Sequence, residues 1–164
     1  MNKKTLKEEK YEHITHPFPP LYDADSKILI LGSLPSVKSR EQMFFYGHPQ
    51  NRFWKVLAEV CQAEVPVSVE EKKAFLLANG IAVWDVIASC RIVGSSDSSI
   101  RDVAANDVAG LLQDSRIEAV FCNGAKSWEL YHRYCEKACQ REAGKLPSTS
   151  PANAAWSPER LIKS

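Results

Sequence analysis

Short apolar runs alternate along the chain with stretches of helical periodicity, and this alternation is the strongest constraint on the fold. Residues 27–31 (KILIL), 81–87 (IAVWDVI) and 117–122 (IEAVFC) are typical of buried strands. Residues 145–150 are the candidate for a short fourth strand or a loop. Because helical segments separate these runs, the sequence predicts an α/β protein: a three-layer α/β/α fold with a short, mostly parallel four-stranded sheet.

The helices are predicted from apolar periodicity and from capping residues. One helix follows Asn51, and another starts at Ser68, where Glu71 completes a capping box. Asn106 is the predicted N-cap of a short third helix. An apolar stripe then predicts one long helix over residues 125–139.

The remaining stretches are rich in charged or turn-forming residues. Residues 1–26 are expected to form an extended, proline-punctuated arm, and residues 33–50 and 91–101 are expected to be loops. A final helix is predicted to begin near residue 157. The length of 164 residues suits one domain, which we take to span residues 1–164.

Composition narrows the class of protein. The chain has no long apolar run and no signal-peptide pattern, and its five cysteines lack a C-x-x-C pair, so we expect a cytoplasmic protein without a membrane partner. His132, Cys135 and Cys139 can share one helix face, but a fourth metal ligand is missing, so no metal is predicted. Neither a Walker A motif nor G-x-G-x-x-G is present, and we expect no cofactor.

The carboxyl ends of the predicted strands define one rim where a ligand is expected to bind. Residues 32–35, 84–87 and 146–150, together with Asn123, lie on this rim. Asp85 also lies there, but an acid in a loop is more often a turn cap, and we assign it no role.

The segment 32–55 (GSLPSVKSREQMFFYGHPQNRFWK) concentrates unusual side chains. Its loop aromatics, residues 44–46, either fill the core or offer a stacking face. Asn51 is either a helix cap or a residue that holds a water molecule or the edge of a base. The net charge is only +1, so any nucleic-acid footprint must be local. The local basic residues are Lys38, Arg40, His48, Arg52 and Lys55.

This segment resembles motif 1 of the uracil-DNA glycosylase superfamily, with its G-x-x-P, its aromatic residue and its H-P-x-N-R-F-W-K. Asn123-Gly124 and residues 146–153 (LPSTSPAN) are similar to the hypoxanthine-DNA glycosylase branch, family 6. The resemblance covers residues 26–156. It implies the fold of that superfamily and a monofunctional enzyme that flips a base out of DNA before attack.

The resemblance also implies residue roles. In most of the superfamily the G-x-x-P loop carries an Asp or Asn that positions water, whereas Leu34 stands there in this chain. In the hypoxanthine branch Asn51 supplies the missing catalytic function, and Tyr46 stacks on the flipped base. Asn123 contacts the polar edge of the base. The base-binding set is Gly32, Ser33, Leu34, Tyr46 and Asn123.

The second motif implies contacts to DNA. Leu146 replaces the histidine that stabilises the departing base elsewhere in the superfamily, so hydroxyl and amide groups of this motif are expected to bind phosphates. The DNA-binding set is Ser36, Lys38, His48, Arg52, Ser148, Thr149 and Ser150. His48 has a competing interpretation as a structural loop histidine.

The sequence therefore predicts a DNA repair glycosylase that hydrolyses the N-glycosidic bond of deaminated bases, chiefly hypoxanthine, and leaves an abasic site. Its partner is double- or single-stranded DNA that contains deaminated bases, bound by a monomer that associates with the nucleoid when it acts. One alternative is a uracil or mismatch-specific glycosylase. Others are a damaged-DNA-binding module inactivated by Leu34 and Leu146, and an unrelated small-molecule enzyme.

Overall fold

The structure, a computed structural model, describes residues 11–16, 18–34, 37–47, 51–93 and 99–149. These residues form two sheets and six helices. None of the helices in these ranges is both long enough and apolar enough to cross a membrane.

The central sheet has four parallel strands in the order β3-β2-β6-β7. Gly32 ends the second strand of the chain and lies opposite Asp85 in the register. The strands are β2 (Ile28–Gly32), β3 (Ile81–Asp85), β6 (Ala119–Asn123) and β7 (Gly144–Leu146). The predicted α/β class and the mostly parallel four-stranded sheet are confirmed, although β7 begins and ends earlier than residues 145–150.

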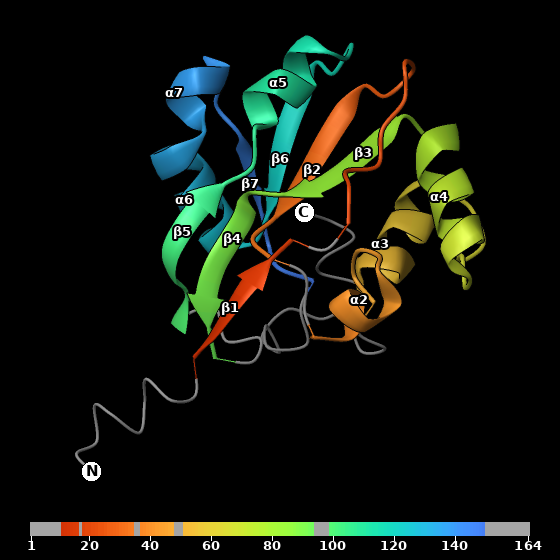
Figure 1. Ribbon diagram of the computed structural model, residues 1–164. Helices are drawn as coiled ribbons and strands as arrows, with labels where there is room; N and C mark the ends of the chain where they lie inside the picture. The colour runs from red at the N-terminus through yellow and green to blue at the C-terminus, as the bar shows by residue number, and fades with distance from the viewer. Residues whose placement is uncertain (1–10, 17, 35–36, 48–50, 94–98, 150–164) are drawn as a thin grey trace.

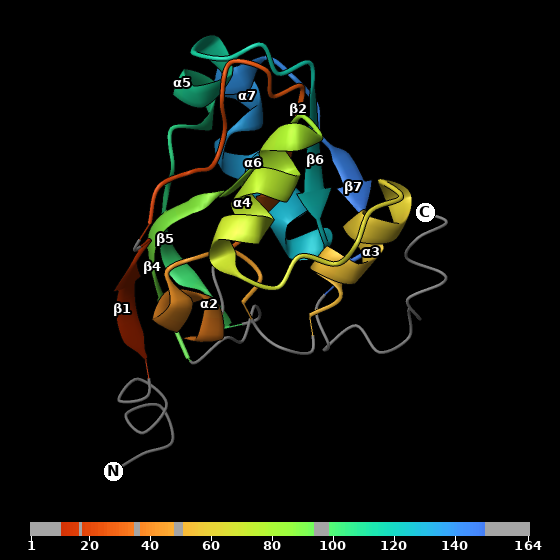
Figure 2. The same ribbon diagram turned by 90° about the vertical axis from the view of Figure 1, so that its right-hand side faces the viewer.

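Helices cover both faces of this sheet, as Figures 1 and 2 show. The helices α3 and α4 lie on one face, and α5, α6 and α7 lie on the other. The bounds are α2 (Val37–Gln42), α3 (Phe53–Val60), α4 (Val69–Ala78), α5 (Val108–Gln113), α6 (Ala125–Tyr134) and α7 (Glu136–Cys139).

The alternation of side chains along β2 divides the core in two. Leu29 and Leu31 are fully buried in one cluster together with Tyr131 of α6. Ile30 points to the other face and packs in a cluster that includes Phe45 and Trp54. Because both faces are buried, the strand appears in the sequence as an uninterrupted apolar run.

A second sheet was not predicted. It is antiparallel, with the order β1-β4-β5, and its strands are β1 (Glu12–Thr15), β4 (Ile87–Ile92) and β5 (Arg101–Ala105). The prediction that residues 1–26 form only an extended arm is therefore wrong, and so is the loop over 91–101 at both of its ends. The strand β1 exposes three of its four residues, and β5 alternates between half-buried and exposed residues, so neither has the uninterrupted apolar run of a strand buried on both faces.

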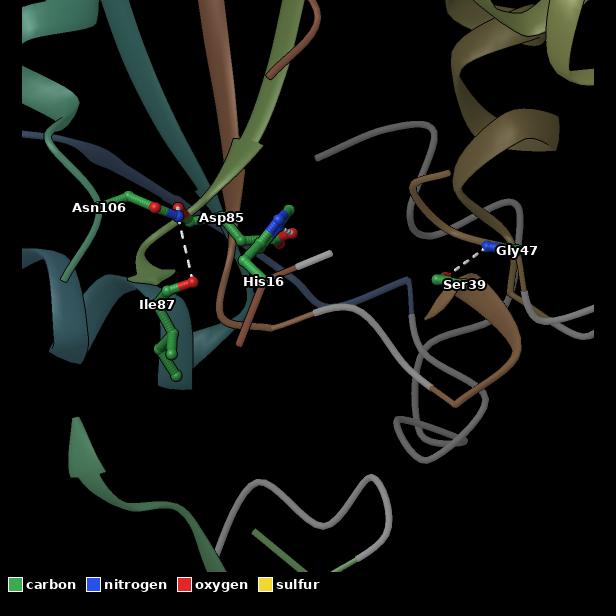
Figure 3. Close-up of polar contacts among 6 residues, drawn as sticks. All are labelled: His16, Ser39, Gly47, Asp85, Ile87 and Asn106. Atoms are coloured by element: carbon green, nitrogen blue, oxygen red, sulfur yellow. Dashed lines mark hydrogen bonds and ion pairs between the residues drawn. The ribbon is translucent and has the colours of Figure 1, made fainter. Parts of the chain in front are cut away.

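Asn106 was predicted to be the N-cap of α5, but Asp107 occupies that position. The Asp107 side chain caps α5, because its Oδ1 accepts a hydrogen bond from the Gly110 amide at 3.0 Å. The side-chain Nδ2 of Asn106 instead donates to the backbone carbonyl oxygens of Asp85 (2.9 Å) and Ile87 (3.1 Å) (Figure 3). Asn106 thus fastens the point where the chain passes from β3 to β4.

The capping box at α4 is confirmed: the Glu71 amide donates to Ser68 Oγ at 3.0 Å, and this hydroxyl group donates to Glu71 Oε1 at 3.2 Å. Two other helix predictions need correction. The loop expected over 33–50 contains the short helix α2, and the long helix expected over 125–139 is interrupted at Cys135 between α6 and α7. The helix predicted near residue 157 lies outside the described residues.

Candidate active site

The candidate site lies at the carboxyl ends of three parallel strands. Gly32 ends β2, Asp85 ends β3 and Asn123 ends β6. Tyr46 follows α2, and Asn51 precedes α3. This is the rim that the strand pattern predicts.

The Tyr46 side chain is held firmly. Its ring stacks on Phe53, with 3.8 Å between ring centroids and 18° between the ring planes. Its φ is +51°, a conformation that costs a non-glycine residue about 1–2 kcal/mol. Neighbours hold this backbone in place: the Trp54 indole donates to the Tyr46 carbonyl at 3.1 Å, and the Gly47 amide donates to Ser39 Oγ at 2.7 Å (Figure 3).

The Tyr46 hydroxyl group remains protonated across the ordinary pH range. Burial raises the pKa of this phenol far above its usual value, and the nearby Asp85 raises it further. The Asn123 side chain has a smaller, opposite effect. The phenol is therefore a neutral group directed at the strand ends.

Thr149 connects Asn51 and Asn123, which are far apart in the sequence. Its Oγ1 donates to Asn51 Oδ1 at 2.8 Å and accepts from Asn123 Nδ2 at 3.0 Å. Its backbone amide donates to Asn123 Oδ1 at 3.1 Å. Thr149 itself is buried, so the three side chains form a fixed network rather than a solvated surface.

Asn51 makes the contact of a helix-start residue and also joins the Thr149 network. Its Oδ1 accepts from the Phe53 amide at 2.9 Å, as a residue at a helix start does, and also from Thr149. Arg52 reinforces this anchor, because its backbone amide and Nε donate to the Thr149 carbonyl at 3.0 and 3.3 Å. These contacts use the oxygen of the Asn51 amide and leave its Nδ2 as the donor to offer to a ligand.

An apolar cavity of about 210 Å³ borders this network between α3 and the central sheet. Among the described residues of its wall, Asn123 and Thr149 are the polar ones, and the apolar ones include Phe53, Leu146 and Pro147. An apolar wall lowers the local dielectric constant and so strengthens the hydrogen bonds of Thr149.

Asp85 and His16 form a buried pair at the same rim (Figure 3). His16 Nε2 lies 2.8 Å from Asp85 Oδ2, and the two side chains are only 4% and 5% exposed. Burial raises the pKa of Asp85, while the hydrogen bond and the charge of His16 lower it. A β-carbon on Gly32 would collide with the Asp85 carboxyl group, which explains why glycine occupies position 32.

Comparison with known proteins places the chain in a family. A family model described as the uracil DNA glycosylase superfamily matches residues 19–163. The chain belongs to the uracil DNA glycosylase superfamily. Its predicted membership, and with it the DNA glycosylase class, is thereby confirmed.

Individual relatives agree with this assignment. A Methanosarcina acetivorans protein named hypoxanthine DNA glycosylase is 35% identical over 90% of this chain and 93% of its own length. A Methanosarcina barkeri protein of the same name is 34% identical over 83% and 86%. A solution NMR structure from M. acetivorans, provisionally described as a uracil DNA glycosylase, superposes with a TM-score of 0.79 at 33% identity and covers 93% of this chain and 94% of its own.

The structure places the base-binding residues that the superfamily resemblance implies around one site. Gly32 and Ser33 use their carbonyl groups to accept hydrogen bonds from Val86 (2.8 Å) and Ile87 (3.0 Å), so the pocket loop is fastened to the start of β4. Leu34 is partly buried against the core and brings no polar group to the site. The missing polar function therefore has to come from elsewhere in the pocket.

The DNA-binding set is only partly described. Thr149 is buried, and its hydroxyl group is hydrogen-bonded to Asn51 within the site. Ser148 is half-buried against Gly124, whose φ is +99°. Lys38 lies on α2, but its side chain is not described. The remaining predicted contacts that fall outside the described residues are Ser36, His48 and Ser150.

The sequence analysis missed the pair of His16 and Asp85. An acid at the end of an apolar strand was a usable signal for Asp85, but it was attributed to turn capping. His16 lies in a segment outside the motifs and gave no signal. The histidine considered as a metal ligand, His132, instead pairs with Glu136 at 2.8 Å, and the described part of the chain contains no cluster of three or more metal-ligating side chains.

Proposed function

We propose that this superfamily member is a monofunctional DNA glycosylase that hydrolyses the N-glycosidic bond of deaminated bases, chiefly hypoxanthine, and leaves an abasic site. The observation that carries the choice of substrate is the similarity, over most of the chain, to two proteins named hypoxanthine DNA glycosylase. The replacement of a water-positioning residue by Leu34, with Asn51 anchored nearby, supports the same choice. The substrate is single- or double-stranded DNA, bound by a monomer.

Tyr46 is the proposed stacking platform for the flipped base. Phe53 covers one face of its ring, so a base stacks on the opposite face. Such stacking contributes about 1–3 kcal/mol per base. Phe53 packs against one face of the Tyr46 ring, and Trp54 holds the Tyr46 backbone. Tyr46 therefore needs little reordering when a base binds.

Asn51 is the proposed catalytic residue. With its Oδ1 engaged by Phe53 and Thr149, its Nδ2 donates to the oxygen of the attacking water or to an acceptor on the base. An amide cannot take the proton of that water. Catalysis therefore rests on positioning and on stabilisation of the departing base rather than on a strong general base.

Hypoxanthine suits a pocket of this strength. It leaves with the electron pair of the glycosidic bond, and its ring delocalises that charge onto its carbonyl oxygen, which adenine lacks. The residues that surround Asn51 in the network are hydroxyl and amide groups, so a covalent Schiff-base intermediate is not expected. The product is an abasic site with an intact strand.

The test is excision from oligonucleotides that contain deoxyinosine or deoxyuridine, with abasic sites revealed by alkaline cleavage. We expect faster release of hypoxanthine than of uracil and a large loss of activity in Asn51→Ala. Asn79→Ala is a matched control, because it removes a 2.8 Å amide hydrogen bond at the exposed end of α4. Faster uracil release would assign a uracil glycosylase, and binding without product would assign a damage-binding module.

A further inference from the structure

His16 and Asp85 form an ionisable pair to which the proposed mechanism gives no role. The rings of Phe18 and Phe45 lie 4.7 and 6.0 Å from the imidazole, so the pair is enclosed by aromatic side chains. The second imidazole nitrogen, Nδ1, is also buried and has no hydrogen-bond partner among the described residues. Burying such a pair costs desolvation energy, so stability alone does not account for it.

The pair is adjacent to Gly32, where the loop that lines the predicted base site begins. Asp85 is opposite Gly32 in the register, and its carboxyl group fills the space that a side chain on Gly32 would need. The Tyr46 hydroxyl group lies 3.4 Å from that same point. Asp85 therefore lies close to the loop that lines the predicted base site and to the proposed stacking residue.

The number of protons on the pair sets the local charge. With one proton, the pair is neutral overall, whether Asp85 or His16 holds it. Without that proton, a bare carboxylate remains in a buried place. The departing base takes the electrons of the broken glycosidic bond, so a negative charge nearby opposes its departure.

We propose that His16 is a positioning residue that keeps the floor of the base pocket electrically neutral by sharing one proton with Asp85. It acts through Asp85 and does not touch the base. The backbone amide of His16 donates to the Ala88 carbonyl at 2.7 Å, which fastens the segment after β1 to β4 and holds the imidazole in place. The proposal rests on the proposed glycosylase function.

The other titratable groups that face this point stay neutral at ordinary pH. Burial raises the pKa of Tyr46 far above its usual value and raises the pKa of Cys122, on β6, to about 12. The hydrogen bond and the charge of His16 lower the pKa of Asp85, against the effect of burial. A change in rate between pH 5 and pH 9 that depends on position 16 therefore reports on the pair.

The experiment measures single-turnover release of hypoxanthine from a deoxyinosine oligonucleotide between pH 5 and pH 9. At pH 8, His16→Gln should be slower than the wild type by roughly 10- to 100-fold, the order expected for a unit charge several ångströms away at intermediate dielectric constant. Toward the low end of this range its rate should approach the wild-type rate, because the raised pKa of the buried Asp85 favours uptake of a proton as the pH falls. His132→Gln is the matched control, since it removes a histidine paired with a carboxylate on the surface.

A double variant separates charge from packing. His16→Gln with Asp85→Asn has no ionisable group at either position, so at pH 8 it should be faster than His16→Gln alone and nearly independent of pH. An equal slowing of His16→Gln at every pH, or a double variant no faster than the single one, would overturn the proposal. If His16→Gln does not fold, the double variant alone decides: a rate within about tenfold of the wild type supports the proposal, and no activity overturns it.

Failure of the proposed function gives a different result. It would appear as a wild-type protein that releases neither hypoxanthine nor uracil. The pair is then tested without substrate, by urea unfolding at pH 5.5 and pH 8. A larger loss of stability for His16→Gln at pH 8 supports the shared proton, and equal losses at the two pH values overturn it.

Discussion

Replacement of Thr149 by valine should weaken the site without changing its shape. Valine has nearly the same volume but lacks the hydroxyl group that bridges Asn51 Oδ1 (2.8 Å) and Asn123 Nδ2 (3.0 Å). Two hydrogen bonds are lost, at about 1 kcal/mol each. Asn51 keeps the Phe53 amide as a partner, whereas Asn123 Nδ2 loses its acceptor. We expect a destabilisation of about 2 kcal/mol.

The effect on catalysis should follow from the same contacts. Asn51 loses one of its two anchors, and each 1.4 kcal/mol of lost positioning slows the reaction about tenfold, so a loss of about 1–2 kcal/mol should slow hypoxanthine release by roughly 5- to 30-fold. Single-turnover kinetics on a deoxyinosine oligonucleotide measure this rate, and urea unfolding measures the stability. Thr149→Ser, which retains the hydroxyl group, should stay close to the wild type. A fast valine variant, or a serine variant as slow as valine, would refute the reasoning.

Three further predictions concern the other side of the pocket. His16→Gln should destabilise the protein more at pH 8, by about 3–5 kcal/mol, than at pH 5. Burial raises the pKa of Asp85 and the lost histidine no longer lowers it, so the variant's stability falls as the pH rises through this folded-state pKa; urea unfolding at both values checks the sign. Tyr46→Ala should reduce excision more than stability. Phe44→Ala, at a residue only 4% exposed, should instead cost about 3–5 kcal/mol of stability. Excision kinetics and urea unfolding of both variants check this, and a Phe44 variant that loses mainly excision, or a Tyr46 variant that loses mainly stability, would contradict it. Gly32→Ala should lower stability by about 1–3 kcal/mol because it collides with the Asp85 carboxyl group, and an unchanged unfolding midpoint would contradict the close approach.

The central sheet could be predicted because its strands are buried on both faces. Residues 28–32 and 81–85 appear as short apolar runs, and no other structure accommodates such runs between helices as simply. The strands β1 and β5 belong to the second sheet and are only partly buried, so their sequences carry no comparable apolar run. Their pairing with β4 depends on contacts between distant parts of the chain.

The candidate site, like the fold, could be predicted only in part from the sequence. Tyr46 and Asn51 could be proposed as site residues because they belong to one contiguous segment of unusual composition. The contact of Thr149 with Asn51 joins residues 98 positions apart, and that of His16 with Asp85 joins residues 69 positions apart. Local patterns contain no information about which distant polar groups will meet, so the contacts of Thr149 and His16 emerge only from the structure.

A single helix supports both proposed working parts of the pocket. Phe53, in the first turn of α3, backs the ring of Tyr46, and the amide of the same residue holds Asn51. The platform for the base and the donor for the water therefore cannot be displaced separately. Any partner, mutation or rise in temperature that shifts the start of α3 would remove both at once, so activity should be lost as a single cooperative event rather than in stages.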